Sequence, residues 1–219
     1  MRLSLSHRNI GLALQAILIA EIVAALWRHQ WFVVFITTGI VAVTLVPLLL
    51  ERRFRVKIPP QFQLLAIAFV FATLFLGEVH GYYTRFWWWD IALHTSSGLL
   101  LGIVGFLLVH LLNETEEVGM HMKPGFVAFF AFLFALGVGV LWELFEFAMD
   151  SFFGMNMQKA MLGDDSGLTD TMIDLLVDAI GALAITVYGY IHLVTADRTS
   201  FLQRWISAFI RHNPGLFRR

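Results

Sequence analysis

Six apolar segments, each close to the length that crosses a lipid bilayer, constrain the fold of this chain more than any other sequence feature. The hydrocarbon core of a membrane is about 30 Å thick, so a spanning helix needs about 20 mostly apolar residues. The segments cover residues 10–27, 31–50, 62–77, 88–112, 126–149 and 171–192. The sequence therefore predicts an all-α bundle of six transmembrane helices, which forms one domain over residues 1–192.

The composition agrees with a multi-pass membrane protein. Hydrophobic residues make up 58% of the 219 residues and charged residues only 14%, whereas soluble domains have about 45–50% and about 25%. These proportions exclude an ordinary soluble globule, a disordered chain and a nucleic-acid binder that uses a basic surface. The chain has no cysteine, which excludes disulfides and thiolate metal sites.

Lysine and arginine residues are concentrated on one side of the predicted bundle. Twelve of the fifteen lie in the N-terminal tail, the second loop, the fourth loop or the C-terminal tail. Cytoplasmic loops of membrane proteins carry such an excess. Both termini are therefore predicted to lie in the cytoplasm.

The segment after the last span, residues 193–219, is predicted to be a cytoplasmic, basic and amphipathic tail. Its apolar residues recur at helical spacing, and they are Phe201, Leu202, Trp205, Ile206, Phe209 and Ile210. This stretch is too short to cross a bilayer, so a helix over residues 199–212 is expected to lie on the membrane interface as an anchor.

The acidic residues have the opposite distribution to the basic ones. Eleven of the sixteen fall on the outer side or in the outer half of a span, where only three basic residues accompany them. They are Glu21, Glu78, Asp90, Glu143, Glu146, Asp150, Asp164, Asp165, Asp170, Asp174 and Asp178. Acidic residues contribute little to membrane topology, so topology does not explain their presence within helices.

Eight ionisable residues in the last three spans recur at spacings of three or four, which places each set on one face of its helix. They are Asp90 and His94, then Glu143, Glu146 and Asp150, and then Asp170, Asp174 and Asp178. By the predicted topology, all three sets lie at the same depth on the same side of the membrane.

An unpaired aspartate in the middle of a spanning helix costs about 2.5–3.5 kcal/mol. Several of them facing one another require protonation, a water-filled cavity or a bound cation. A divalent cation compensates the most charge and suits oxygen ligands. The eight residues are therefore candidate metal ligands, and a set of carboxylates with one imidazole favours Mg, Mn, Fe, Zn or Ca over a soft metal.

Simpler structural roles compete with the metal site for several of these residues. Asp170 suits the first turn of a helix, where an acid is favourable, and His94 could be a hydrogen-bonded core histidine. Asp164 and Asp165 fit a solvated turn between glycines. Glu21 fits an ion pair with a nearby arginine. The glycines at 98, 102, 105, 137 and 139 are expected to permit close contact between helices.

Three stretches carry a resemblance to a known family. They are residues 89–94 (WDIALH), residues 139–150 (GVLWELFEFAMD) and residues 170–182 (DTMIDLLVDAIGA). Together they resemble the YjdF-like family of bacterial inner-membrane proteins, over about residues 60–192. The resemblance implies a bacterial inner membrane and an acidic motif set, and it implies no substrate. The order of acids is also similar to VanZ-like proteins, which typically have Asn where this chain has Asp178.

Three functions remain open at this point. The first is a metal-dependent hydrolase or transferase that acts on a membrane lipid or a lipid-linked substrate, with Glu146 or Asp174 as general base and His94 as acid or ligand. The second is a cation or proton-coupled transporter, because intramembrane acids mark such pathways. The third is a metal-binding membrane protein without chemistry. The inner halves of the last three spans are almost free of ionisable residues, which favours a site open to one side. Membrane lipids are the expected partners, and nucleic acids are not.

Overall fold

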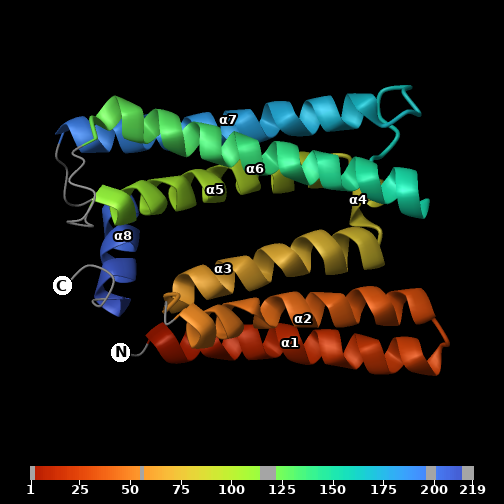
Figure 1. The fold of residues 1–219 in the computed structure, drawn as a ribbon. Coiled ribbons are helices and arrows are strands. Elements are labelled where there is room, and N and C mark those ends of the chain that lie inside the picture. The colour runs from red at the N-terminus through yellow and green to blue at the C-terminus, as the bar shows by residue number, and fades with distance from the viewer. Residues whose placement is uncertain (1–2, 55–56, 114–121, 196–200, 214–219) are drawn as a thin grey trace. The chain divides into compact units, whose positions relative to one another are not determined.

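The computed structural model describes residues 3–54, 57–113, 122–195 and 201–213, and within these ranges the chain is mainly helical (Figure 1). The elements are α1 (Leu3–Trp27), α2 (Trp31–Phe54), α3 (Pro60–Val70), η1 (Phe71–Val79), α4 (Tyr82–Arg85), α5 (Trp89–Asn113), α6 (Pro124–Phe153), α7 (Leu168–Thr195) and α8 (Phe201–His212). The described residues form no β-strand beyond a single bridge between Met161 and Asp164. The predicted all-α class is confirmed.

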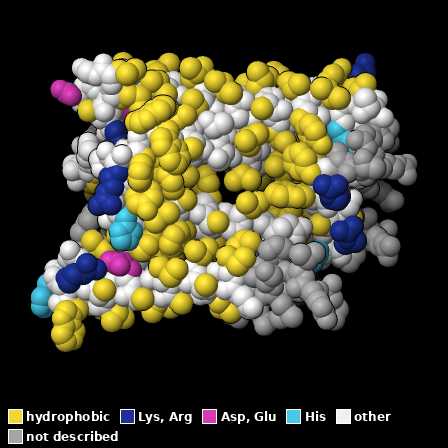
Figure 2. Space-filling model, turned by 180° about the vertical axis from the view of Figure 1, so that it is seen from behind, with side chains coloured by type: hydrophobic (Ala, Val, Ile, Leu, Met, Phe, Trp, Pro, Cys, Tyr) yellow, Lys and Arg dark blue, Asp and Glu magenta, His cyan; other side chains and the backbone are white. Residues whose placement is uncertain are grey.

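Five stretches are long and apolar enough to cross a membrane: Asn9–Trp27, Pro60–Val79, Trp89–Val109, Pro124–Phe153 and Leu168–Thr195. A shorter apolar stretch, Val33–Val43, lies in α2. The chain thus has five to six spanning helices, and the count of six and the cytoplasmic termini stay predictions. Hydrophobic side chains cover most of the helix surfaces visible in Figure 2, as lipid-facing helices require.

The helix boundaries extend beyond the predicted spans where local chemistry permits it. Proline supplies the first turn of both α3 and α6, where its missing N–H removes no helical hydrogen bond. At its other end, α6 continues past residue 149 to Phe153 and stops at Gly154. This glycine has a φ of 61°, a left-handed conformation that is typical of helix C-termini.

The chain divides into two compact units. The first unit comprises Met1–Trp89 with Ala208–Pro214, and it contains α1, α2, α3, η1 and α4. Its core is formed by large apolar side chains, with Leu18, Ile40 and Phe75 buried together. The packing of this unit therefore depends on interlocking aliphatic and aromatic groups.

A nine-residue π-helix, η1, continues α3 without a break. Its last turn ends with the His80 N–H donating to the Phe75 carbonyl, a bond across five residues. Gly77 lies inside this stretch, and a Cβ there would be 2.4 Å from the Tyr83 ring. The wider helix and the glycine together let the Tyr83 ring pack against the backbone.

The end of α8 is tied to the segment before α3 by a reciprocal pair of hydrogen bonds. The Lys57 N–H donates to Asn213 Oδ1 over 2.6 Å, and Asn213 Nδ2 donates to the Lys57 carbonyl over 2.7 Å. Asn213 is buried. One side chain therefore satisfies both polar groups of the Lys57 backbone.

The second unit contains α5, α6 and α7, which run side by side in Figure 1, within Asp90–Ser207. Glycines bring its helices into backbone contact. A Cβ at Gly98 would lie 2.2 Å from the Asp178 carbonyl oxygen, and one at Gly181 would lie 2.2 Å from the Thr95 carbonyl oxygen. No larger residue fits at either position without moving a helix.

The other glycines named from the sequence divide into two groups. Gly102, Gly105 and Gly139 contact Ile185, Ala131 and Asp178 closely, as expected. Gly137 has no atom within 4 Å of a built Cβ. The expectation of close helix contact is therefore confirmed for four of the five positions and is wrong for Gly137.

The amphipathic segment forms α8, and its apolar side is covered by protein. Leu202 and Ile206 are buried, and the Phe201 ring stacks on Tyr188 with centroids 5.0 Å apart. Ile206 also lines a small cavity with residues of α5, α6 and α7. These contacts of α8 are with the chain itself, whereas its predicted place on the membrane interface stays untested. Residues 196–200 and 214–219 of the predicted tail lie outside the described residues.

Candidate metal centre

The imidazole of His94, on α5, lies at the centre of a cluster of carboxylates from all three helices of the second unit. Its Nε2 atom is 3.6 Å from Asp90 Oδ1 and 3.8 Å from Asp174 Oδ2. Its Nδ1 atom is 3.3 Å from Asp178 Oδ2 and 3.8 Å from Glu143 Oε1. We call these five residues the His94 cluster. The structure thus brings together five of the eight residues that the spacing singled out.

The spacing along the helices explains how the cluster forms. Asp90 and His94 are four residues apart on α5, and so are Asp174 and Asp178 on α7, which places each pair on one helix face. The contacts of Gly98 and Gly181 set those two faces against each other at this depth. Glu143 completes the cluster from α6.

The cluster is almost closed to its surroundings. Asp174 and Asp178 are each 1% exposed, and Glu143 is 4% exposed. Both carboxylate oxygens of Glu143 and both of Asp174 lack a hydrogen-bond partner among the described residues. A buried carboxylate oxygen without a hydrogen-bond partner costs several kcal/mol, so these four atoms could accept a bound cation.

The Nε2 side of the ring has the geometry of a metal site. Ligand atoms of Asp90, His94 and Asp174 all lie within 4.8 Å of one another. Two carboxylates and an imidazole are a ligand set that Zn²⁺, Fe²⁺ and Mn²⁺ accept. The residues on this side therefore fit a divalent cation.

Ser97 is a further member of the site that the sequence analysis did not identify. Its hydroxyl lies within a short hydrogen-bond distance of Asp178 Oδ1. Its position one turn after His94 on α5 is the signal that identifies it, because residues three apart share a helix face.

Glu146 lies one helical turn beyond Glu143 and is buried. Its Oε1 accepts a hydrogen bond of 2.8 Å from the indole Nε1 of Trp142. No ion pair with His94 is formed by this residue in the part of the chain that the structure describes. Trp142 was also missed from the sequence, although its spacing of four from Glu146 predicts the contact.

Two further candidate ligands bind the backbone of the loop between α6 and α7. Asp150 accepts hydrogen bonds of 2.7 and 2.8 Å from the N–H groups of Met157 and Gln158. Asp170 accepts one of 2.7 Å from the Lys159 N–H, and its other oxygen is buried without a partner among the described residues. The structure does not bring either residue into contact with His94.

The acidic loop before α7 is ordered by Asp164. Its carboxylate accepts hydrogen bonds from the Ser166 and Thr169 N–H groups, each 2.9 Å long. Hydrogen bonds to the Ser166 and Thr169 side chains and N–H groups hold the pKa of Asp164 below its usual value. Asp164 therefore caps the start of α7 from within the turn between glycines.

Glu21 has the structural role expected of it. Its Oε1 lies 2.8 Å from Arg28 Nη2. The ion pair neutralises this acid within the first unit, and the alternative of a structural partner is confirmed.

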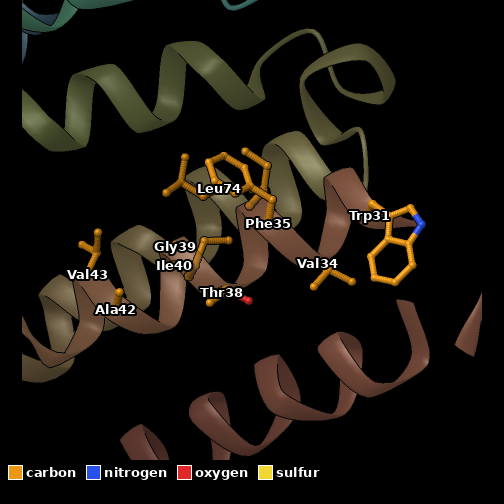
Figure 3. A pocket seen from close by; sticks show the side chains of 10 residues that line it. Trp31, Val34, Phe35, Thr38, Gly39, Ile40, Ala42, Val43 and Leu74 are labelled. Atoms are coloured by element: carbon orange, nitrogen blue, oxygen red, sulfur yellow. The ribbon is translucent and has the colours of Figure 1, made fainter. Parts of the chain in front are cut away.

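A groove of about 660 Å³ lies in the first unit along α2 (Figure 3). Its lining is apolar apart from Thr38, and it includes Trp31, Phe35 and Leu74. None of the described residues that line it is a carboxylate. The groove therefore has no part in the metal centre.

Comparison with known proteins supports the sequence resemblance. The family described as predicted membrane protein (DUF2238) matches residues 10–195. The chain belongs to this family. DUF2238 is YjdF-like, so the predicted family is confirmed, and the chain is a multi-pass membrane protein.

One relative of this DUF2238 chain is an uncharacterized protein of Thermotoga maritima. It is 28% identical over 145 residues, which is 66% of this chain and 69% of the relative. No solved structure matches the chain. The His94 cluster lies entirely within the residues that the DUF2238 family matches.

Proposed function

We propose that the His94 cluster holds a divalent cation, and that the protein uses this ion in a reaction on a membrane lipid or a lipid-linked substrate. The observation that carries the cation is the set of orphaned oxygens on Asp174 and Glu143. The ion would be Mg²⁺, Mn²⁺, Fe²⁺, Zn²⁺ or Ca²⁺, according to the ligand set. A bacterial inner membrane and an outward-facing site remain part of the proposal.

Charge counting supports a bound cation. Glu143, Asp174 and Asp178 are buried around one imidazole, and Asp90 adds a fourth carboxylate. Among the described residues, no Lys or Arg forms an ion pair with Glu143, Asp174 or Asp178. Carboxylates at such distances repel one another strongly in a medium of low dielectric constant. A divalent ion removes this repulsion at a single point.

The distribution of polar groups along α7 favours a site that opens to one side. After Asp178, the next acidic or imidazole side chain on this helix is His192, about 21 Å further along. Between them, the Thr186 hydroxyl donates back to the Ala182 carbonyl. A transport path needs polar groups that continue across the membrane, so this arrangement supports an enzyme over a transporter.

Residues of α5, α6 and α7 would have separate roles in the proposed reaction. A divalent cation at this position supplies Lewis acidity toward a phosphoryl or ester oxygen and lowers the pKa of bound water. Asp90, His94 and Asp174 would hold it. Glu146, fixed by the Trp142 indole, would accept a proton as general base. Asp90 is the most exposed carboxylate of the His94 cluster, with 16% of its side chain accessible, and would lie nearest the substrate.

A second candidate is a cation site without chemistry. The burial of Glu143, Asp174 and Asp178 favours it, because a lipid head group does not reach a closed cluster. In that case the ion would only join α5, α6 and α7.

Metal analysis of the purified full-length protein tests the cation. Wild type and the control Asp165→Asn, which changes an exposed acid, are expected to retain about one ion per chain and to lose thermal stability in chelator. Asp174→Asn is expected to lose the ion. A wild type that holds no ion and melts unchanged in chelator would refute the metal centre.

A second experiment separates the enzyme from the passive site. The protein is incubated with vesicles of phosphatidylethanolamine and phosphatidylglycerol, and mass spectrometry follows the lipids. Glu146→Gln is expected to retain the ion and to lose turnover. Absence of any product with metal-loaded wild type would contradict an enzyme on these lipids and would favour the passive site. Cation uptake into proteoliposomes that depends on Asp174 would favour a transporter instead.

A further inference from the structure

The ring of His94 presents its two nitrogens to different carboxylates. Asp90 and Asp174 lie on the Nε2 side, and Asp178 and Glu143 lie on the Nδ1 side. A histidine that ligates a metal through one nitrogen carries a proton on the other, and a hydrogen-bond acceptor fixes which nitrogen that is. The environment of each carboxylate therefore decides where the ion binds.

Both oxygens of Asp178 already have polar neighbours within the chain. The Ser97 hydroxyl is hydrogen-bonded to its Oδ1, and its Oδ2 lies 3.3 Å from His94 Nδ1. A Cβ at Gly139 would lie 2.6 Å from that same Oδ2, so the backbone of α6 closes over it. This carboxylate is held from three sides by α5 and α6.

Asp174 has the opposite environment at the same depth of burial. Neither of its oxygens has a hydrogen-bond partner among the described residues. Its Oδ2 lies 3.8 Å from Nε2, and together with Asp90 it forms the group whose ligand atoms lie within 4.8 Å. The two orphaned oxygens of Asp174 are thus on the Nε2 side of the ring, whereas those of Glu143 are on the Nδ1 side and outside this group of ligand atoms.

We propose that Nε2 of His94 is the ligating nitrogen, with Asp90 and Asp174 as the anionic ligands, and that Asp178 is a positioning residue. Asp178 accepts the Nδ1–H of His94 and is itself oriented by Ser97. Glu143 lies on the Nδ1 side and stabilises the proton there by its charge. This assignment rests on the cation of the proposed function.

The tautomer of His94 tests the assignment directly. The full-length protein, labelled with ¹⁵N-histidine in detergent micelles, is titrated with Zn²⁺, and His94→Gln identifies the signals of this residue. The expected spectrum has a protonated Nδ1 and a Zn²⁺-bound Nε2. Zn²⁺ on Nδ1 would overturn the assignment while leaving a metal centre intact. Absence of any Zn²⁺-dependent change at His94 would instead refute the proposed function.

Zn²⁺ affinities of variants give an independent test. Loss of a residue that orients a metal-bound histidine typically weakens binding by about 10- to 100-fold, so Ser97→Ala is expected to weaken Zn²⁺ binding by about tenfold. Ser96→Ala is the matched control, since that hydroxyl only donates to the Ala92 carbonyl, and it is expected to leave the affinity unchanged. Equal effects of the two variants would contradict a role for Ser97.

Conservative replacement of the two aspartates separates a ligand from a positioning residue. The amide oxygen of Asp178→Asn still accepts the Nδ1–H, so this variant is expected to retain Zn²⁺ affinity within about tenfold. Asp174→Asn removes an anionic ligand and is expected to lose well over 100-fold. A loss at Asp178→Asn as large as that at Asp174→Asn would make Asp178 a ligand and overturn the assignment.

Discussion

The two units of this protein accommodate an acid within their helices in different ways. In the first unit, Glu21 pairs with Arg28 seven residues along the same chain. In the second unit, Asp174 and Glu143 are more deeply buried and have no hydrogen-bond partner among the described residues. The first arrangement is self-sufficient, whereas the second is the one for which we propose a cation from outside the chain. On this proposal, the function belongs to the second unit.

The two units also differ in the side chains that pack between their helices. Large side chains such as Leu18, Ile40 and Phe75 fill the core of the first unit. In the second unit, Gly98 and Gly181 bring the backbones of α5 and α7 together at the level of the carboxylates. Close helix contact is what presents His94 to Asp174 and Asp178. The glycines are thus part of the site, although they carry no chemistry.

The largest effect on stability is expected from a substitution that forces the backbones of α5 and α7 apart. Gly181→Ala places a Cβ 2.2 Å from the Thr95 carbonyl oxygen, and a backbone clash of this kind costs about 3 kcal/mol or more. Both the free energy of unfolding, measured by detergent titration, and Zn²⁺ binding are expected to fall.

Gly39→Ala in the first unit is the matched control. No atom lies within 4 Å of a built Cβ there, and alanine is favoured over glycine in a helix by up to about 1 kcal/mol. This variant is expected to be neutral or more stable, with normal Zn²⁺ binding. Similar losses for Gly39→Ala and Gly181→Ala would show that the two units do not differ in packing.

A smaller effect is expected in the first unit from Asn213→Ala. The change removes both hydrogen bonds between the buried Asn213 side chain and the Lys57 backbone, which typically costs about 1–3 kcal/mol of stability. Zn²⁺ binding is expected to be unchanged, because no acid of the His94 cluster is involved. Arg211→Ala, which changes an exposed neighbour on α8, serves as the control. The account of this unit fails if Asn213→Ala is no less stable than Arg211→Ala.

The smallest expected effect is the dependence of stability on pH through Asp164. Asp164 has a lowered pKa because it accepts hydrogen bonds from Ser166 and Thr169. A carboxylate of this kind adds stability above its unfolded pKa of about 3.9, and that stability is lost as the pH falls through the lower, folded pKa. An NMR titration of the two amides is expected to show an inflection below pH 3.9. An inflection at or above that value would remove the capping role.

The sequence predicted the helices because each apolar run is long, and it predicted that acids share a face because their spacing is three or four. It did not predict which faces meet, since helix rotation depends on contacts such as Gly98 with Asp178. For the same reason Ser97 was missed as the partner of Asp178.

Acids near helix ends were harder to interpret from the sequence. Asp150 continues the spacing of Glu143 and Glu146, yet its carboxylate binds two loop N–H groups. Asp164 caps α7 in a similar way. Sequence spacing does not reveal where a loop folds back, so it cannot separate such acids from those of a metal site. The π-helix η1 likewise follows from packing rather than from a local sequence signal.

Anomalous scattering from a crystal of the full-length protein grown with Zn²⁺ tests the central claim most directly. The account predicts one peak in the second unit, within about 2.0–2.2 Å of His94 Nε2 and of a carboxylate oxygen from each of Asp90 and Asp174. No peak at this position, with the three side chains turned apart and separately hydrated, would contradict it.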